Sequence, residues 1–135
     1  MTYTKGFGMK IRVYYEDTDM GGIVYHANYL KFCERARSEY FFQGGTTPHL
    51  EEGEFVAASM QAKFKASAKL GDMLNVRTDV LSLKSSSLLL KQCVYKDEVL
   101  LFDMEIKLGF VKNGKIGRMS KEALVYVQEL FGKNV

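Results

Sequence analysis

A short stretch near the N-terminus combines the residue types that acid–base chemistry requires. Residues 15–29, YEDTDMGGIVYHANY, contain two aspartates, a glycine pair and one of the two histidines of the chain. A carboxylate beside a scissile carbonyl can act as general base on water or attack the carbonyl directly. Asp19 is the candidate for either role, because Gly21 and Gly22 let the backbone approach a substrate closely. Asp17 is predicted instead to shape the turn, with its side chain bonded to nearby backbone.

His26 is the second candidate catalytic residue, and two roles are open for it. Its imidazole would orient water or the carboxylate. Alternatively, only its backbone N–H contributes, because N–H groups at a helix start have no partner within the helix and lie at the positive end of its dipole. The N–H groups of Gly22, Tyr25 and His26 are therefore the candidate oxyanion hole.

Two segments of different hydrophobic period flank these residues. Alternation over residues 11–16 predicts a half-buried strand that runs out at Gly21–Gly22. From about Ala27 the apolar residues recur at helical spacing, which predicts an amphipathic helix of about five turns. Asn28 or the residue before it is the expected cap, and Gly44–Gly45 the expected stop. The candidate residues thus lie at a strand-to-helix junction.

The rest of the chain is predicted to be mostly strand. Residues 46–53 are expected to form a loop, and a short helix preceded by Ser120 is expected at 121–131. One long helix followed by antiparallel strands predicts an α+β fold in which a curved sheet wraps a central helix. The exposed sheet edges and the apolar helix seam predict pairing with a second copy. The four strands are expected at residues 55–69, 73–83, 88–95 and 99–111.

Composition limits the domain organisation and the class of partner. The chain has 135 residues with one proline and no low-complexity tract, which predicts a single domain over residues 1–135. A net charge of +3 with dispersed lysines is too weak for nucleic-acid binding, although it suits an anionic small molecule. No apolar run approaches the roughly 18 residues of a membrane span, and no secretory signal is evident, so we expect a cytoplasmic protein.

Metal and serine chemistry are both disfavoured by the residue pattern. Cys33 and Cys93 lie within apolar patterns without metal-like spacing, so we expect reduced, packed thiols. Asp17, Asp19 and His26 lack the second histidine or the cysteine set of a convincing metal site. No G-x-S-x-G motif is present to supply a serine nucleophile.

The motif of residues 15–29, continued by FCERARSE at 32–39, closely resembles the signature of the hotdog-fold acyl-CoA thioesterases. The match is to the YbgC type, associated with the Tol-Pal envelope system, within the wider 4-hydroxybenzoyl-CoA thioesterase family. The resemblance implies the hotdog fold and a homodimer with active sites at its interface, frequently assembled into a homotetramer. It assigns the catalytic carboxylate to Asp19 and the histidine position to His26. Tyr15 and Asn28, in the same motif, are the candidate contacts to substrate.

The expected activity is hydrolysis of an acyl-CoA to a free acid and coenzyme A. A departing thiolate needs little protonation, because the thiol pKa is about 8.5, so a strong general acid is dispensable. The only cofactor-like group is the coenzyme A of the substrate itself. Lys84, Ser85 and Ser86 are the predicted phosphate contacts, in a donor-rich turn. The alternative phosphate contacts are Lys63, Lys65 and Lys69.

Two other functions remain open at this stage. The hotdog fold also hosts hydratases and dehydratases, which alter the acyl chain and release no thiol. The second rival is a non-catalytic protein that docks on acyl carrier protein or on membrane-biosynthesis enzymes, with the acidic residues 51–54 as a contact. Thiol release from acyl-CoA esters separates these alternatives from a thioesterase.

Overall fold

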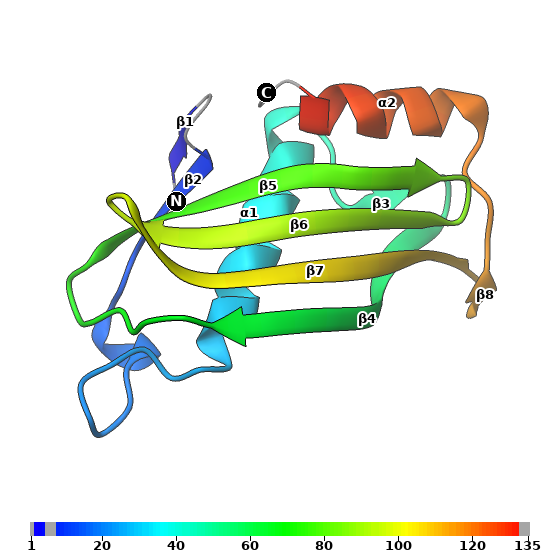
Figure 1. Ribbon diagram of the computed structural model, residues 1–135. Coiled ribbons are helices and arrows are strands. Elements are labelled where there is room, and N and C mark those ends of the chain that lie inside the picture. The colour runs from blue at the N-terminus through cyan, green and yellow to red at the C-terminus, as the bar shows by residue number, and fades with distance from the viewer. Residues whose placement is uncertain (1, 5–7, 133–135) are drawn as a thin grey trace.

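An antiparallel sheet wraps around one long helix in the computed structural model, which describes residues 2–4 and 8–132 (Figure 1). The described strands follow the order β1-β2-β5-β6-β7-β4-β3 in one sheet, and β8 pairs with β7. The predicted α+β arrangement is therefore confirmed. The elements in chain order are β1 (Thr2–Thr4), β2 (Gly8–Arg12), the 3-10 helix η1 (Tyr15–Asp17), α1 (Asn28–Gln43), β3 (His49–Leu50), β4 (Gly53–Phe64), β5 (Met73–Lys84), β6 (Ser87–Lys96), β7 (Val99–Lys112), β8 (Lys115–Ile116) and α2 (Lys121–Gly132).

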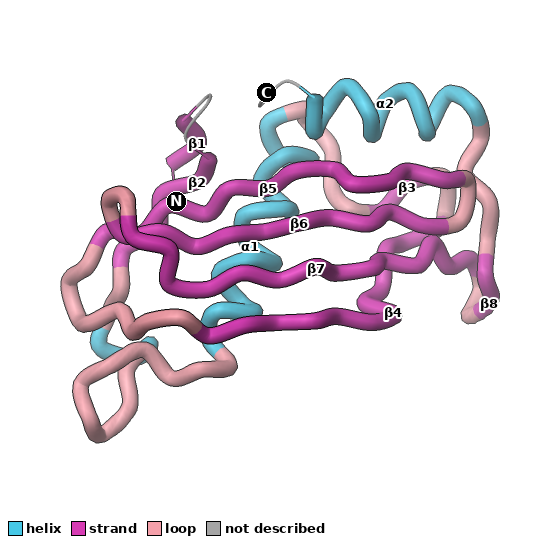
Figure 2. The backbone as a smooth tube through the Cα atoms, in the orientation of Figure 1, coloured by secondary structure: helices cyan, strands magenta, loops and turns pink. Residues whose placement is uncertain are grey.

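Helix α1 packs against one face of the sheet because its apolar residues recur at helical spacing. Phe32, Cys33 and Ala36 are fully buried on this face. Alternate residues of the long strands meet them, among them Leu90 on β6 and Phe102 on β7. Figure 2 shows the helix crossing behind the long strands of the sheet. The start of α1 is thereby held at one end of the sheet, where the candidate residues lie.

The four long strands agree with the prediction except at their ends. The first was expected to reach residue 69 but ends at Phe64, because the N–H groups of Lys65 and Ala66 both turn to the carbonyl of Leu101, at 2.8 and 3.1 Å. The expected loop at residues 46–53 contains the two-residue strand β3, which pairs with the start of β4. Neither difference changes the sheet order.

The predicted strand at residues 11–16 is wrong at its C-terminal end. Strand β2 ends at Arg12, and Tyr15 lies in η1. Val13 still donates its N–H to the Asp72 carbonyl at 2.9 Å, but the N–H of Tyr14 donates to Oδ2 of Asp17 at 2.8 Å. A short acidic side chain that captures a nearby N–H competes with the sheet ladder and favours a turn. The expectation that Asp17 shapes the turn is confirmed.

A buried glutamine fixes α1 over the sheet. The Nε2 group of Gln92 on β6 donates to the Cys33 carbonyl at 2.9 Å and to Thr78 Oγ1 at 3.0 Å. Its Oε1 accepts a hydrogen bond from Nη1 of Arg37 at 3.3 Å. Burial lowers the pKa of Arg37. Because buried polar groups need partners, these bonds favour one position of the helix on the sheet.

Helix α2 is fastened to the chain at its start and near its middle. Ser120, just before the helix, donates its N–H and hydroxyl hydrogen to the Glu51 carboxylate, and its Oγ accepts the Ala123 N–H at 3.1 Å. The hydroxyl hydrogen bond from Ser120 lowers the pKa of Glu51. Farther along, the hydroxyls of Tyr126 and Thr46 are hydrogen bonded. Glu51, in the acidic loop predicted to contact a partner, is thus engaged within the chain.

Candidate active site

The segment between η1 and α1 forms a tight turn that begins at Asp19. The N–H of Asp19 donates to the Ile23 carbonyl at 2.9 Å, and the N–H of Gly22 donates to the Asp19 carbonyl at 3.0 Å. Gly22 has a φ of +79°, in the left-handed region that favours glycine. The glycine is therefore required by the turn itself.

This turn is joined to the β4–β5 connector, residues 65–72, through main-chain atoms. The Val24 N–H donates to the Ala68 carbonyl at 2.9 Å, and Ile23 forms an antiparallel bridge with Lys69. The N–H of Ala68 donates to the hydroxyl of Tyr29 in the first turn of α1, at 3.0 Å. Turn, connector and helix start therefore form one hydrogen-bonded unit.

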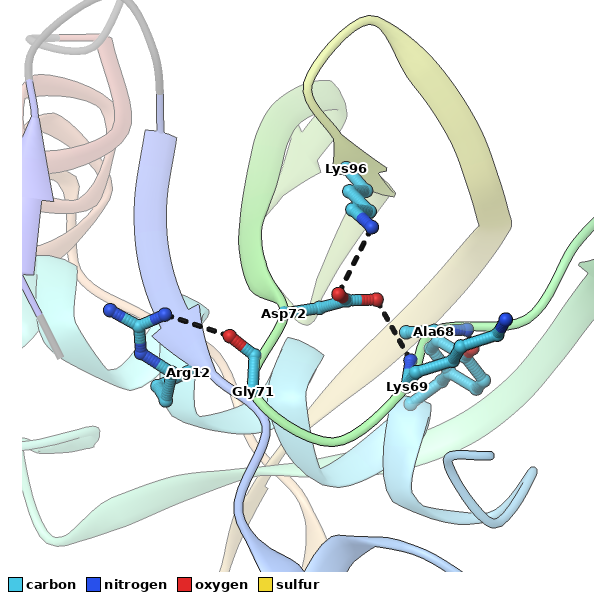
Figure 3. Close-up of polar contacts among 7 residues, drawn as sticks. Arg12, Ala68, Lys69, Gly71, Asp72 and Lys96 are labelled. Atoms are coloured by element: carbon cyan, nitrogen blue, oxygen red, sulfur yellow. Dashed lines mark hydrogen bonds and ion pairs between the residues drawn. The ribbon is translucent and has the colours of Figure 1, made fainter. Parts of the chain in front are cut away.

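Asp72 closes the connector at its C-terminal end (Figure 3). Its Oδ2 accepts the Lys69 N–H at 2.8 Å, and its Oδ1 lies 3.0 Å from the Lys96 ammonium. The neighbouring carbonyl of Gly71 accepts a hydrogen bond from Nη1 of Arg12 at 2.7 Å. Desolvation raises the pKa of Asp72, but the Lys69 N–H and the Lys96 ammonium outweigh it, so the pKa lies below its ordinary value.

Asp72→Asn is expected to lower the free energy of unfolding by about 1 kcal/mol at pH 7, mainly through the weakened hydrogen bond, because the exposed Lys96 pair is screened. Because the Asp72 pKa is lower in the folded protein than in the unfolded chain, where it is about 3.9, the ionised carboxylate stabilises the fold at pH values above 3.9. That stabilisation is lost as the pH falls through the pKa of the folded state. Urea denaturation near pH 7 and near pH 2.5 measures the effect. The difference between wild type and variant should shrink at the lower pH, and an equal difference at both would contradict the prediction.

A cavity of about 270 Å³ lies between the turn, the first turn of α1 and the end of β4. The imidazole of His26 meets the Phe64 ring edge-on, with centroids 5.9 Å apart, and lies 4.5 Å from the ring of Tyr25. The structure thus brings the two candidate catalytic residues to one cavity. Its lining consists of Asp19, Ile23, Val24, His26, Tyr29, Phe64, Lys65, Ala66 and Ser67.

The Asp19 carboxylate is oriented but still open to solvent. Its Oδ1 accepts the Gly21 N–H at 2.8 Å, which fixes the side chain against the turn. Within the described residues, Oδ2 has no hydrogen-bond partner. One oxygen is therefore held by the backbone while the other is available to water or a substrate.

Among the described residues, one of the three candidate oxyanion donors lacks an acceptor. The N–H of Gly22 donates to the Asp19 carbonyl, and the N–H of Tyr25 donates to the Asp17 carbonyl at 3.0 Å. The His26 N–H has no acceptor among residues 2–4 and 8–132. The backbone N–H of His26 is therefore the remaining candidate for the oxyanion donor.

Asn28 and Tyr15 lie on either side of the turn. Helix α1 has Ala27 at its cap position without a side-chain cap, while Asn28 Nδ2 donates to the Asp17 carbonyl at 2.9 Å. The Asn28 side chain therefore supports the turn rather than capping the helix. Tyr15 is 82% exposed on η1, which leaves its ring available to a ligand.

The predicted phosphate turn lies at the far end of the sheet. Lys84, Ser85 and Ser86 join β5 to β6 at the end opposite the turn that carries Asp19 (Figure 1). Within one chain these residues are not brought together with the cavity. Of the alternative lysines, Lys65 lines the cavity, whereas Lys63 pairs with Asp103 in the β4–β7 register.

Comparison with known proteins identifies the family of this chain. The sequence profile of the thioesterase superfamily matches residues 21–102, which includes His26, α1 and most of the sheet. The chain belongs to the thioesterase superfamily. The resemblance drawn from residues 15–39 is thereby confirmed.

Bacterial thioesterases are similar to this one over most of its length. The acyl-CoA thioesterase YbgC of Helicobacter pylori is 47% identical over 112 residues, 76% of this chain and 84% of that protein. The YbgC protein of Haemophilus influenzae is 39% identical over 115 residues, 82% and 85% of the two chains. The crystal structure of a probable thioesterase from Bartonella henselae, 28% identical, covers 83% of this chain and 97% of that one with a TM-score of 0.78. The expected hotdog fold is confirmed.

The candidate site contains a residue that the sequence did not single out. Tyr29 lines the cavity and accepts the Ala68 N–H, yet a tyrosine at helical spacing is indistinguishable from core in sequence. Its position three residues after His26 was the available signal, since residues three apart are neighbours on a helix.

Neither described helix is long and apolar enough to cross a membrane.

Proposed function

We propose that this thioesterase hydrolyses acyl-CoA thioesters to a free acid and coenzyme A. One arrangement carries the proposal: the Asp19 carboxylate and His26, whose N–H lacks an acceptor among the described residues, line the same cavity. The YbgC relatives are acyl-CoA thioesterases, which supports acyl-CoA as the substrate class.

In the proposed reaction, Asp19 supplies the nucleophile and the His26 N–H stabilises the oxyanion. The carboxylate either activates water or attacks the acyl carbonyl to form an anhydride that water then cleaves. The N–H at the helix start stabilises negative charge on the carbonyl oxygen as it develops. Coenzyme A leaves as its thiolate. Single turnover in ¹⁸O-labelled water tests the anhydride route, because label in the Asp19 carboxylate requires an anhydride that water opens at the Asp19 carbonyl.

A homodimer is proposed to complete the site through the edge of β4. Strand β3 pairs only with Gly53 and Glu54, so residues 55–64 have no partner on this edge within the described chain. On the helix-facing side, Met60 is 42% exposed and Phe64 is also exposed. Unpaired, apolar strand edges favour pairing with another chain. Burial by the partner would also exclude water from Asp19, which strengthens its electrostatic interactions.

The dimer would also bring the predicted phosphate turn to the cavity. Antiparallel pairing of β4 with its copy rotates the partner by 180°, so the end of the sheet that carries the β5–β6 turn lies beside the end that carries Asp19. We propose that the partner's Lys84 and Ser85 contact the phosphates of coenzyme A. The same rotation would bring the partner's cavity of about 440 Å³, at the start of the partner's β4, to this end of the sheet, and we propose that it receives the acyl group.

Thiol release from a panel of acyl-CoA esters tests the proposal. A thioesterase releases free coenzyme A, which a colorimetric thiol reagent detects continuously. A hydratase or dehydratase would modify the acyl chain without releasing thiol, and mass spectrometry of the products would show this. A non-catalytic acyl-carrier-protein partner would leave every ester intact. Either of these results would overturn the proposed function.

His26→Ala separates the two roles proposed for this residue. The substitution keeps the backbone N–H and removes the imidazole, so kcat should fall by less than about tenfold if the N–H is the contributor. General acid–base catalysis by the ring would instead cost about 10²- to 10⁴-fold. Steady-state kcat and KM, with circular dichroism to verify folding, measure the effect. A loss of 10²-fold or more would assign the chemistry to the imidazole.

A further inference from the structure

The hydroxyl of Tyr29 is a buried hydrogen-bond donor that the reaction described above does not use. Tyr29 is only 3% exposed, and its ring stacks on Phe102 with centroids 5.2 Å apart at 12°. Its oxygen accepts the Ala68 N–H at 3.0 Å. A phenol can donate one hydrogen as well as accept, yet no described residue accepts the hydrogen of Tyr29. Buried tyrosine hydroxyls normally find such a partner.

The position of this hydroxyl points to a ligand. Tyr29 lines the same cavity as Asp19 and His26. The stacked ring and the Ala68 hydrogen bond fix the oxygen in place before any ligand arrives. Desolvation raises the pKa of Tyr29, while the Ala68 N–H lowers it and Asp72 raises it further, so the phenol stays protonated at neutral pH. The group is therefore a fixed donor rather than a base.

We propose that the Tyr29 hydroxyl donates to the acyl carbonyl oxygen of the bound thioester, as a second donor beside the His26 N–H. The inference rests on the proposed function of the cavity. His26 lies two residues before α1 and Tyr29 in its first turn, and the Tyr29 N–H donates to the His26 carbonyl oxygen at 3.4 Å, so the two residues are neighbours at the entry to the helix. Negative charge that develops on the carbonyl oxygen strengthens both hydrogen bonds. When the C=O bond re-forms, the C–S bond breaks and the negative charge leaves on the thiolate.

Besides the His26 imidazole, which His26→Ala tests, two side chains in the cavity could donate, but neither is fixed. Lys65 and Ser67 are exposed on the connector, and no hydrogen bond within the described residues holds either side chain. Ordering a long, mobile side chain around a ligand costs conformational entropy. Tyr29 is already ordered by its ring contacts. A donor that is fixed before the reaction stabilises the transition state most effectively, because it need not reorganise as charge develops.

Tyr29→Phe tests the proposal, because phenylalanine keeps the ring that stacks on Phe102 and removes only the hydroxyl. We expect kcat to fall by about 10²-fold, the lower part of the range for losing one oxyanion donor, with a much smaller change in KM. An unchanged kcat would overturn the assignment. The variant also loses the acceptor for the Ala68 N–H, so a readout independent of turnover and local structure is needed.

Two unreactive coenzyme A derivatives provide that readout. In the ketone analogue a methylene replaces the sulfur and the carbonyl is kept, whereas in the thioether the sulfur is kept and a methylene replaces the carbonyl. Titration calorimetry should show that Tyr29→Phe weakens the ketone by about tenfold or more and leaves the thioether unchanged. Equal weakening of both analogues, or no weakening of the ketone, would overturn the role of Tyr29. If neither analogue binds the wild type, the proposed function itself fails, and this inference with it.

Tyr126→Phe is the matched control. It removes a phenol that is hydrogen bonded to Thr46 at α2, away from the cavity. Its melting temperature should fall, while kcat and the affinities for both analogues stay at wild-type values. If Tyr29→Phe behaves in the same way as this control, its hydroxyl is only structural and the proposal is wrong.

Discussion

Asp19→Asn should lower kcat for acyl-CoA hydrolysis by about 10²- to 10⁴-fold, because an amide can neither accept a proton from water nor attack the acyl carbonyl. The turn should persist in this variant. Asparagine keeps an oxygen that can accept the Gly21 N–H, which Oδ1 of Asp19 now accepts at 2.8 Å. Steady-state thiol release measures the loss, and analytical ultracentrifugation verifies that assembly is unchanged.

Asp97→Asn is the control for this prediction. Asp97 lies in the β6–β7 turn with a φ of 54°, a conformation that asparagine also tolerates. The control removes one carboxylate from an exposed turn far from the cavity in sequence, and full activity is expected. If the Asp19→Asn enzyme has the wild-type kcat, the Asp19 carboxylate takes no part in the reaction and the proposed mechanism is wrong.

Met60→Asp should convert the proposed dimer into monomers and remove most of the activity with it. Met60 lies at the middle of the unpaired β4 edge, opposite Ile106 of β7, where the partner would bury it. A buried, unpaired carboxylate costs about 3 kcal/mol or more, which weakens dimerisation by about 10²-fold or more. Near the twofold axis the two carboxylates would also repel each other. Sedimentation velocity over a concentration series, with kcat/KM measured in parallel, detects both effects.

Val125→Asp provides the comparison for Met60→Asp. Val125 is an exposed apolar residue on α2, away from the β4 edge, so the same change in charge should leave both assembly and activity intact. A Met60→Asp protein that is monomeric but fully active would contradict a site shared between two chains. One that stays dimeric would contradict the β4 interface.

The sequence predicted the fold wherever hydrophobic period was unambiguous. The helical spacing that includes Cys33 and Ala36 located α1, and the glycine pair at Gly44 located its end. Strand ends were missed where one or two hydrogen bonds decide them. The Asp17 carboxylate draws Tyr14 out of the first strand, and the Leu101 carbonyl takes two N–H groups at the end of β4. Hydrophobic periodicity in the sequence does not predict such hydrogen bonds, because they join atoms that only folding brings together.

The candidate site was predicted in its residues but not in its hydrogen bonding. Asp19 and His26 do line one cavity, as their place at a strand-to-helix junction predicted. Which N–H groups stay free was not predictable, because Gly22 and Tyr25 donate to carbonyls of the turn itself. Tyr29 was not predicted as a site residue, because its buried ring makes it look like a core residue in the sequence. Only the structure shows that Tyr29 lines the cavity.

The attachment of the Asp19 turn to the β4–β5 connector bears on how this enzyme can change. The Val24–Ala68 hydrogen bond joins two main-chain groups, so it does not depend on which side chains the connector carries. Only Ala68 is buried between residues 65 and 70, while Lys65 and Ser67 line the cavity from the exposed side. Substitutions at these two positions can therefore alter the cavity wall without moving the carboxylate. Laboratory evolution for a new acyl preference should begin at positions 65 and 67, because substitutions there leave the backbone hydrogen bonds that hold the Asp19 turn in place.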